Sequence, residues 1–92
     1  MSSGAYIVEV YEPRTGAGGG AAAAARAHSV AEQMRAEGSG VRFLRSIFLP
    51  HDEMCFYVFE AASPKEVTEA AARAGIRANR VVEPVSIEAR PE

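Results

Sequence analysis

The sequence has a single cysteine, Cys55, and no tryptophan among its 92 residues. One cysteine excludes a disulfide bond within the chain. A chain this short buries only a modest core, so oligomerisation or metal binding are the remaining ways to add stability. We therefore expect one domain over residues 1–92, with an ordered core from about residue 5 to about residue 89.

Long apolar runs and basic clusters are also missing. No apolar run approaches the roughly 18 residues that a membrane helix needs, and the start "MSSGAYIVEV" lacks the basic residues and spacer of a secretory signal. Lysine occurs once, at Lys65, and the arginines are spread along the chain. These absences predict a cytoplasmic protein that binds neither membranes nor nucleic acid.

Four segments are rich in β-branched and aromatic residues, which is typical of strands. Two further segments are typical of helices: an alanine-rich stretch that ends at Gly38, and "SPKEVTEAAARAG", which ends at Gly75. In the second, Ser63 is a good N-cap and Glu66 completes a capping box. The expected strands are residues 5–11, 41–50, 54–61 and 80–89, and the expected helices are residues 21–38 and 63–75.

This order, β-α-β-β-α-β, predicts a ferredoxin-like α+β sandwich with both helices on one face of the sheet. The third strand is apolar on both faces and belongs in the middle of the sheet. Pro84 in the fourth strand favours an edge position or a bulge. The bare sheet face needs a cover, and a homodimer of the dimeric α+β barrel type is the simplest one.

Strict alternation along the first two strands divides their side chains between the two faces, although a slip of one residue would invert the assignment. One face takes Tyr6, Val8 and Val10 with Leu44, Ser46 and Phe48, and the other takes Ile7, Glu9 and Tyr11 with Phe43, Arg45 and Ile47.

The connection "HDEMC" gathers potential metal ligands between the second and third strands. Imidazole and carboxylate groups suit Ni²⁺ and its first-row neighbours. His28 and Glu32 stand four residues apart on the first helix, a spacing that brings two side chains together. The candidate ligands are therefore His51, Asp52, Glu53 and His28. The alternative is a polar hairpin turn and a solvated ion pair, with Cys55 as a small buried apolar residue.

A second group of candidate residues places charged side chains on strands that are otherwise apolar. It consists of Glu9, Arg45, Glu60 and Glu83, if all four point the same way. Charges at such positions are costly unless they are paired. One hypothesis is an ion-pair network at a dimer interface. The other is a cofactor-independent enzyme of the cyclase, isomerase or monooxygenase type, whose glutamate acts as acid or base on a small aromatic or polyketide-like substrate.

The stretch from Leu49 to Ile87 resembles the second half of a family of small bacterial ferredoxin-like proteins known as nickel-binding proteins. The matching motifs are D-E-x-C-F, F-E-A, an A-G turn and R-[IV]-V-E, and "YIVEVYEP" fits the start of the family. The resemblance implies a dimeric α+β fold and binding of Ni²⁺ at the protein surface. The leading functional hypothesis is therefore sequestration of a divalent metal, nickel, by a homodimer.

Overall fold

The computed structural model describes residues 3–13 and 20–84. Their secondary structure follows the predicted order β-α-β-β-α-β. The elements of this part of the chain are β1 (Gly4–Tyr11), α1 (Ala21–Ala36), β2 (Arg42–Leu49), β3 (Met54–Ala61), α2 (Pro64–Arg73) and β4 (Arg80–Val82).

The four strands form one antiparallel sheet in the order β2-β3-β1-β4. This order confirms the predicted ferredoxin-like α+β fold. It also places β3 inside the sheet and β4 at its edge, as the apolar run of β3 and the position of Pro84 predicted. The strand β4 ends at Val82, and the predicted extension through residues 85–89 lies outside the described part of the chain.

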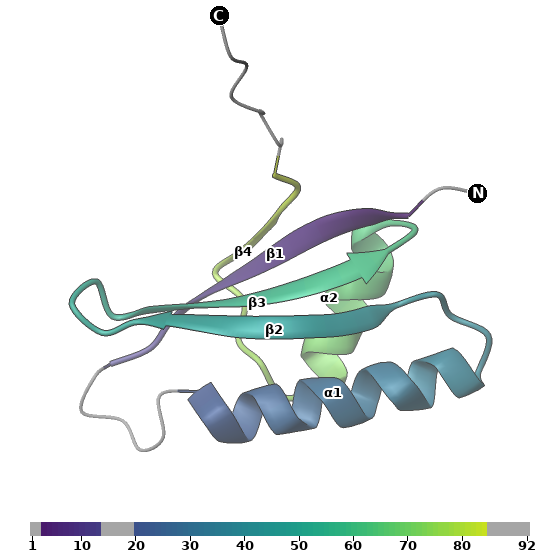
Figure 1. Ribbon diagram of the computed structural model, residues 1–92, viewed down its shortest axis with the longest axis horizontal. Helices are drawn as coiled ribbons and strands as arrows, with labels where there is room; N and C mark the ends of the chain where they lie inside the picture. Colours follow the sequence, from purple (N-terminus) through teal and green to yellow (C-terminus); the bar gives the residue numbers. More distant parts are fainter. Residues whose placement is uncertain (1–2, 14–19, 85–92) are drawn as a thin grey trace, which may run out of the picture.

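Both helices cover the same face of the sheet, with α1 along β2 and α2 behind the central strands (Figure 1). Between sheet and helices lies one apolar core, to which both helices contribute mostly alanine and valine. Small residues let the helices approach the sheet closely, and the larger side chains come from the strands. No helix within the described ranges is both long and apolar enough to cross a membrane.

The helix ends form where the local sequence predicts them. The Ser63 hydroxyl accepts a hydrogen bond from the Glu66 backbone N–H (3.5 Å), which is one half of the predicted capping box. The Glu66 carboxylate accepts from the backbone N–H of Ala62 (3.2 Å), one residue further back than the usual partner. Gly38 and Gly75 both have positive φ, at 105° and 73°, and both follow the C-cap of a helix as predicted.

The predicted alternation along β2 is wrong for Phe43 and Leu44. A bulge between Phe43 and Arg45 places Phe43 opposite Phe59, on the helix-covered face, whereas Arg45 stands opposite Val58 on the other face. Phe43 packs against the core, and Leu44 is 47% exposed. Because a bulge inserts one residue into a strand, strict alternation fails at that point.

The sheet face away from the helices is called the open face below. Its members follow from the strand register. They are Ala5, Ile7, Glu9 and Tyr11 on β1, Arg42, Arg45, Ile47 and Leu49 on β2, Met54, Phe56, Val58 and Glu60 on β3, and Arg80 and Val82 on β4.

Candidate functional site

The turn between β2 and β3 presents two of the predicted metal ligands to solvent. His51 and Asp52 are both exposed. The turn is held by backbone hydrogen bonds from Asp52 N–H to Leu49 C=O and from Glu53 N–H to Pro50 C=O, each 3.2 Å long. An imidazole and a carboxylate thus stand next to each other at the tip of a hydrogen-bonded turn.

Glu53, the third predicted ligand in this turn, is engaged with β1. It is half-buried and adopts a left-handed backbone conformation with φ of 51°. Its carboxylate accepts a hydrogen bond from the Tyr11 hydroxyl (3.4 Å), and its carbonyl accepts one from the Glu12 backbone N–H (2.7 Å). Glu53 therefore connects the hairpin to the end of β1.

His28 and Glu32 form the predicted pair on α1, with 3.9 Å between His28 Nδ1 and Glu32 Oε1. Both side chains are more than half exposed. They border a groove of about 200 Å³ between α1 and the edge strand β2, which Arg35 and Arg42 also line. The two guanidinium groups make this groove more favourable for an anion than for a cation.

The predicted ligands do not form one closed site within a single chain. Across residues 3–13 and 20–84, no three side chains of His, Cys, Asp or Glu come together as a group able to hold a metal ion. The two exposed pairs, His51 with Asp52 and His28 with Glu32, each offer one imidazole and one carboxylate. A metal bound at either pair needs further ligands from water or from a second chain.

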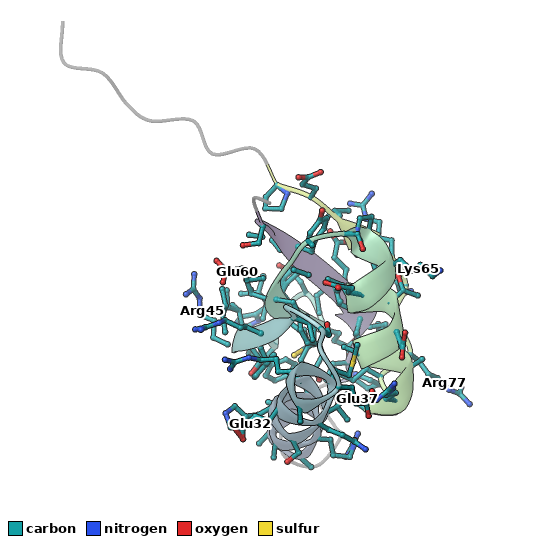
Figure 2. The ribbon with its side chains drawn as sticks, turned by 90° about the vertical axis from the view of Figure 1, so that its right-hand side faces the viewer. Glu32, Glu37, Arg45, Glu60, Lys65 and Arg77 are labelled. Atoms are coloured by element: carbon teal, nitrogen blue, oxygen red, sulfur yellow. The ribbon has the colours of Figure 1, made fainter. Side chains whose placement is uncertain are left out.

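The register shows which of the charged candidate residues share a face. Glu9, Arg45 and Glu60 all lie on the open face. Figure 2 shows Arg45 and Glu60 on the side of the molecule opposite Lys65 and Arg77. Glu83 follows the end of β4 and lies beside Gly4, so it does not continue the ladder of paired residues.

Two arginines that sequence analysis did not single out take part in this face. The Arg80 Nε donates to Glu9 Oε1 at 2.9 Å, across the β1–β4 ladder. This bond raises the pKa of the Arg80 guanidinium, so this group stays positively charged. Arg42 stands directly opposite Glu60. Only the cross-strand register reveals that Arg80 lies opposite Glu9 and Arg42 opposite Glu60, because the two residues of each pair are distant in the sequence.

The open face holds the Glu9–Arg80 ion pair among apolar neighbours, and this geometry differs from that of an enclosed catalytic pocket. Neither the groove beside α1 nor the cavity described below is lined by Glu9, Arg45, Glu60 or Glu83. The enzyme hypothesis stays a prediction.

Cys55 is fully buried on the helix-covered side of β3, as predicted. Burial raises the pKa of its thiol above the usual value, because a thiolate is poorly solvated there. The neighbouring Tyr57 hydroxyl, which shares a hydrogen bond with this thiol, also has its pKa raised by burial. Both groups therefore remain protonated near neutral pH, and Cys55 is not an activated nucleophile.

These features define a small ferredoxin-like α+β protein with imidazole and carboxylate groups on an exposed turn and an exposed helix face. The chain belongs to the SCO4226-like family of nickel responsive proteins, whose family model matches residues 7–83. This match confirms the family resemblance that the motifs of the second half indicated. No curated protein and no solved structure matches the chain.

Proposed function

We propose that this protein binds Ni²⁺ at its surface and sequesters it in the cytoplasm as a homodimer. The observation that carries the proposal is the match to the nickel responsive family over residues 7–83. The exposed donor chemistry supports it, because imidazole nitrogen and carboxylate oxygen are ligands that Ni²⁺ accepts. In this proposal, Ni²⁺ is the ion that the protein binds and sequesters, rather than a resident cofactor.

The proposed ligands are His51 and Asp52 at the hairpin tip. His28 with Glu32 on α1 is the weaker second pair, because Arg35 and Arg42 line the same groove. Each pair supplies an incomplete set, so water or a second chain completes the coordination. Glu53 orients the turn through its 3.4 Å bond with Tyr11, and its carboxylate is the third proposed ligand at this end of the hairpin. Open, two-donor sites suit reversible binding better than the closed four-ligand sites typical of structural metals.

A homodimer is the proposed assembly because the open face combines exposed apolar side chains with the Glu9–Arg80 ion pair. Tyr11, Ile47 and Leu49 are 54%, 42% and 39% exposed, and all three belong to this face. Pairing two copies through this face removes them from water, and Glu9 on the same face already has Arg80 as a partner.

The proposal is tested by isothermal titration of the chelator-treated protein with Ni²⁺. We expect saturable binding at micromolar concentration or tighter, and a loss of about tenfold or more in affinity in the His28→Ala/His51→Ala variant, which has no imidazole left. Mg²⁺, which prefers oxygen ligands and keeps its water, should bind far more weakly.

The matched control is Gln33→Ala, because Gln33 is an exposed polar residue on the same helix as His28. It should leave the affinity for Ni²⁺ unchanged. Equal affinity in the double histidine variant and in the native protein would show that the assigned ligands are wrong. Single variants then separate the two sites, since removal of one histidine should lower the stoichiometry while the other site keeps its affinity.

A further inference from the structure

A second cavity lies at the end of the sandwich, between the end of β1, the first turns of α1 and the segment that follows α2. Its volume is about 220 Å³, and we call it the Tyr57 pocket. Its walls are partly apolar, from Val10, Ala23 and Ile76, and Tyr57 also lines it. Ligand sites of drug-sized molecules usually measure about 300–1,000 Å³, so this pocket suits a smaller molecule.

Arg26 supplies an anchored positive charge at the wall of this pocket. Its Nε donates a hydrogen bond to the carbonyl of Ala74, the C-cap of α2, at 2.8 Å. That bond holds the guanidinium in place, and no hydrogen bond joins its two terminal nitrogens to a residue within 3–13 or 20–84. None of the carboxylates in the described ranges forms an ion pair with Arg26. A planar guanidinium in this state is well suited to a carboxylate, which it binds through two parallel hydrogen bonds.

Tyr57 adds a buried polar group to the same pocket. The residue is 1% exposed, and its hydroxyl shares a hydrogen bond with the Cys55 thiol. Gly20 packs directly on this pair: a Cβ at Gly20 would lie 2.9 Å from the Tyr57 hydroxyl oxygen and 3.0 Å from Cys55 Sγ. The absence of a side chain at position 20 therefore lets the backbone close over the phenol.

Two further charged residues line the pocket, and they oppose each other in sign. Glu12 is half-buried, and its charge acts on both Tyr57 and Cys55, whose protonated forms it favours. Arg77 extends outward from the body of the protein (Figure 2), so it contributes to the rim. With Arg26 and Arg77 against Glu12, the described residues that line the pocket carry a net positive charge.

We propose that the Tyr57 pocket binds a small organic carboxylate with an apolar body. The carboxylate binds the terminal nitrogens of Arg26, and the apolar body packs against Val10, Ala23 and Ile76. The pocket shares no residue with the proposed nickel ligands on α1 and on the hairpin turn. The Tyr57 pocket is therefore a site separate from both proposed nickel sites.

Benzoate is the probe for this site, and benzyl alcohol is its neutral counterpart of similar size and shape. Two-dimensional amide NMR of the full chain should show saturable shifts for residues around the pocket on addition of benzoate. Benzyl alcohol should bind at least about fivefold more weakly, because it lacks the charge that Arg26 recognises. Equal affinity for the two compounds, or shifts that never saturate, would overturn the proposal.

A pair of variants on α1 tests the location. Ala23→Leu places three extra carbon atoms in the pocket and should weaken benzoate binding about tenfold or more. Ala25→Leu is the matched control, since Ala25 is exposed on the same helix and lines neither cavity. Both proteins are checked for an intact fold by their amide spectra. Unchanged benzoate binding in a folded Ala23→Leu protein would place the ligand elsewhere and reject this pocket.

Variants that remove one charge give a second, independent test, because the loss of Glu12 and the loss of Arg26 should change the affinity for benzoate in opposite directions. Glu12→Gln should tighten benzoate binding, because it removes a negative charge beside the carboxylate. Arg26→Gln should weaken it, whereas Arg77→Gln at the rim should change it by less than about twofold. Weaker binding in the Glu12→Gln variant would contradict the assigned polarity of the site.

Discussion

At the scale of single residues, Gly20 shows how one position without a side chain closes the core. Its φ of 87° lies in the left-handed region, and the space above it is already filled by the Tyr57 hydroxyl and the Cys55 sulfur. Glycine is favoured there for two separate reasons, the backbone conformation and the close approach. The sequence shows only a run of glycines before a helix, which does not single out position 20.

Replacement of glycines by alanine should therefore have graded effects on stability. Gly20→Ala should lower the free energy of unfolding by about 2–4 kcal/mol, from left-handed strain together with the steric clash. Gly38→Ala, with φ of 105° and open space around it, should cost only the strain, about 1–2 kcal/mol. Urea denaturation measures the free energy of unfolding of each variant.

Gly40→Ala is the control in this series, because nothing lies within 4 Å of its added Cβ and its φ is not left-handed. It should be neutral or slightly stabilising. Equal losses in the Gly20→Ala and Gly38→Ala proteins would show that the contact with Tyr57 and Cys55 contributes nothing.

At the scale of secondary-structure elements, α2 is the part that the local sequence specifies best. Ser63, Pro64 and Glu66 predict its beginning and Gly75 predicts its end, and the helix runs from Pro64 to Arg73. All of these signals act within one or two helical turns, so they are visible in the sequence. By contrast, the bulge in β2 depends on the partner strand β3, and the alternation of Phe43 and Leu44 was mispredicted for that reason.

Removal of the N-cap should destabilise the protein modestly. Ser63→Ala deletes the acceptor for the Glu66 N–H, and because that bond is long at 3.5 Å we expect a loss of about 0.5–1 kcal/mol. Ser29→Ala, at an exposed position inside α1, is the control and should be neutral or slightly stabilising, since alanine favours helix interiors. Thermal unfolding followed by circular dichroism compares the two variants. A larger loss in Ser29→Ala than in Ser63→Ala would argue against the cap.

At the scale of the whole molecule, the ferredoxin-like sandwich covers only one face of its sheet. The helices bury Tyr6, Val8 and Val10 on that side, whereas the open face keeps Tyr11, Ile47 and Leu49 accessible. Val58 on the open face is 7% exposed even in a single chain, because its neighbours on β1 and β2 surround it. The apolar character of this face, together with the Glu9–Arg80 ion pair, is the basis for the proposed homodimer.

Ile47→Glu should convert the proposed dimer to a monomer, since it places a carboxylate in the proposed apolar interface. The fold should survive, because Ile47 is 42% exposed in a single chain. Leu44→Glu is the control: Leu44 is equally apolar and 47% exposed, but it borders the groove beside α1. Light scattering coupled to size-exclusion chromatography distinguishes the two assemblies.

The native protein and the Leu44→Glu variant should have twice the mass of one chain at micromolar concentration, and Ile47→Glu should have the mass of one. A native protein that is already monomeric at that concentration would contradict the proposed assembly.

The sequence by itself determined the order of the elements, both ends of α2, the C-terminal end of α1, the central place of β3 and the edge position of β4. Apolar periodicity, capping residues and proline act locally and leave clear patterns. Its motifs also indicated the family, which the match over residues 7–83 confirms.

Only the tertiary structure decided the pairing of Glu9 with Arg80, the side of β2 on which Phe43 lies, and the engagement of Glu53 with Tyr11. It also brought Arg26, Tyr57 and Ile76 together around one pocket. These contacts join residues that are far apart in the sequence, and strand register and helix packing set them. The Tyr57 pocket therefore exists only in the folded chain, whereas the donor pairs His51 with Asp52 and His28 with Glu32 are already local in the sequence.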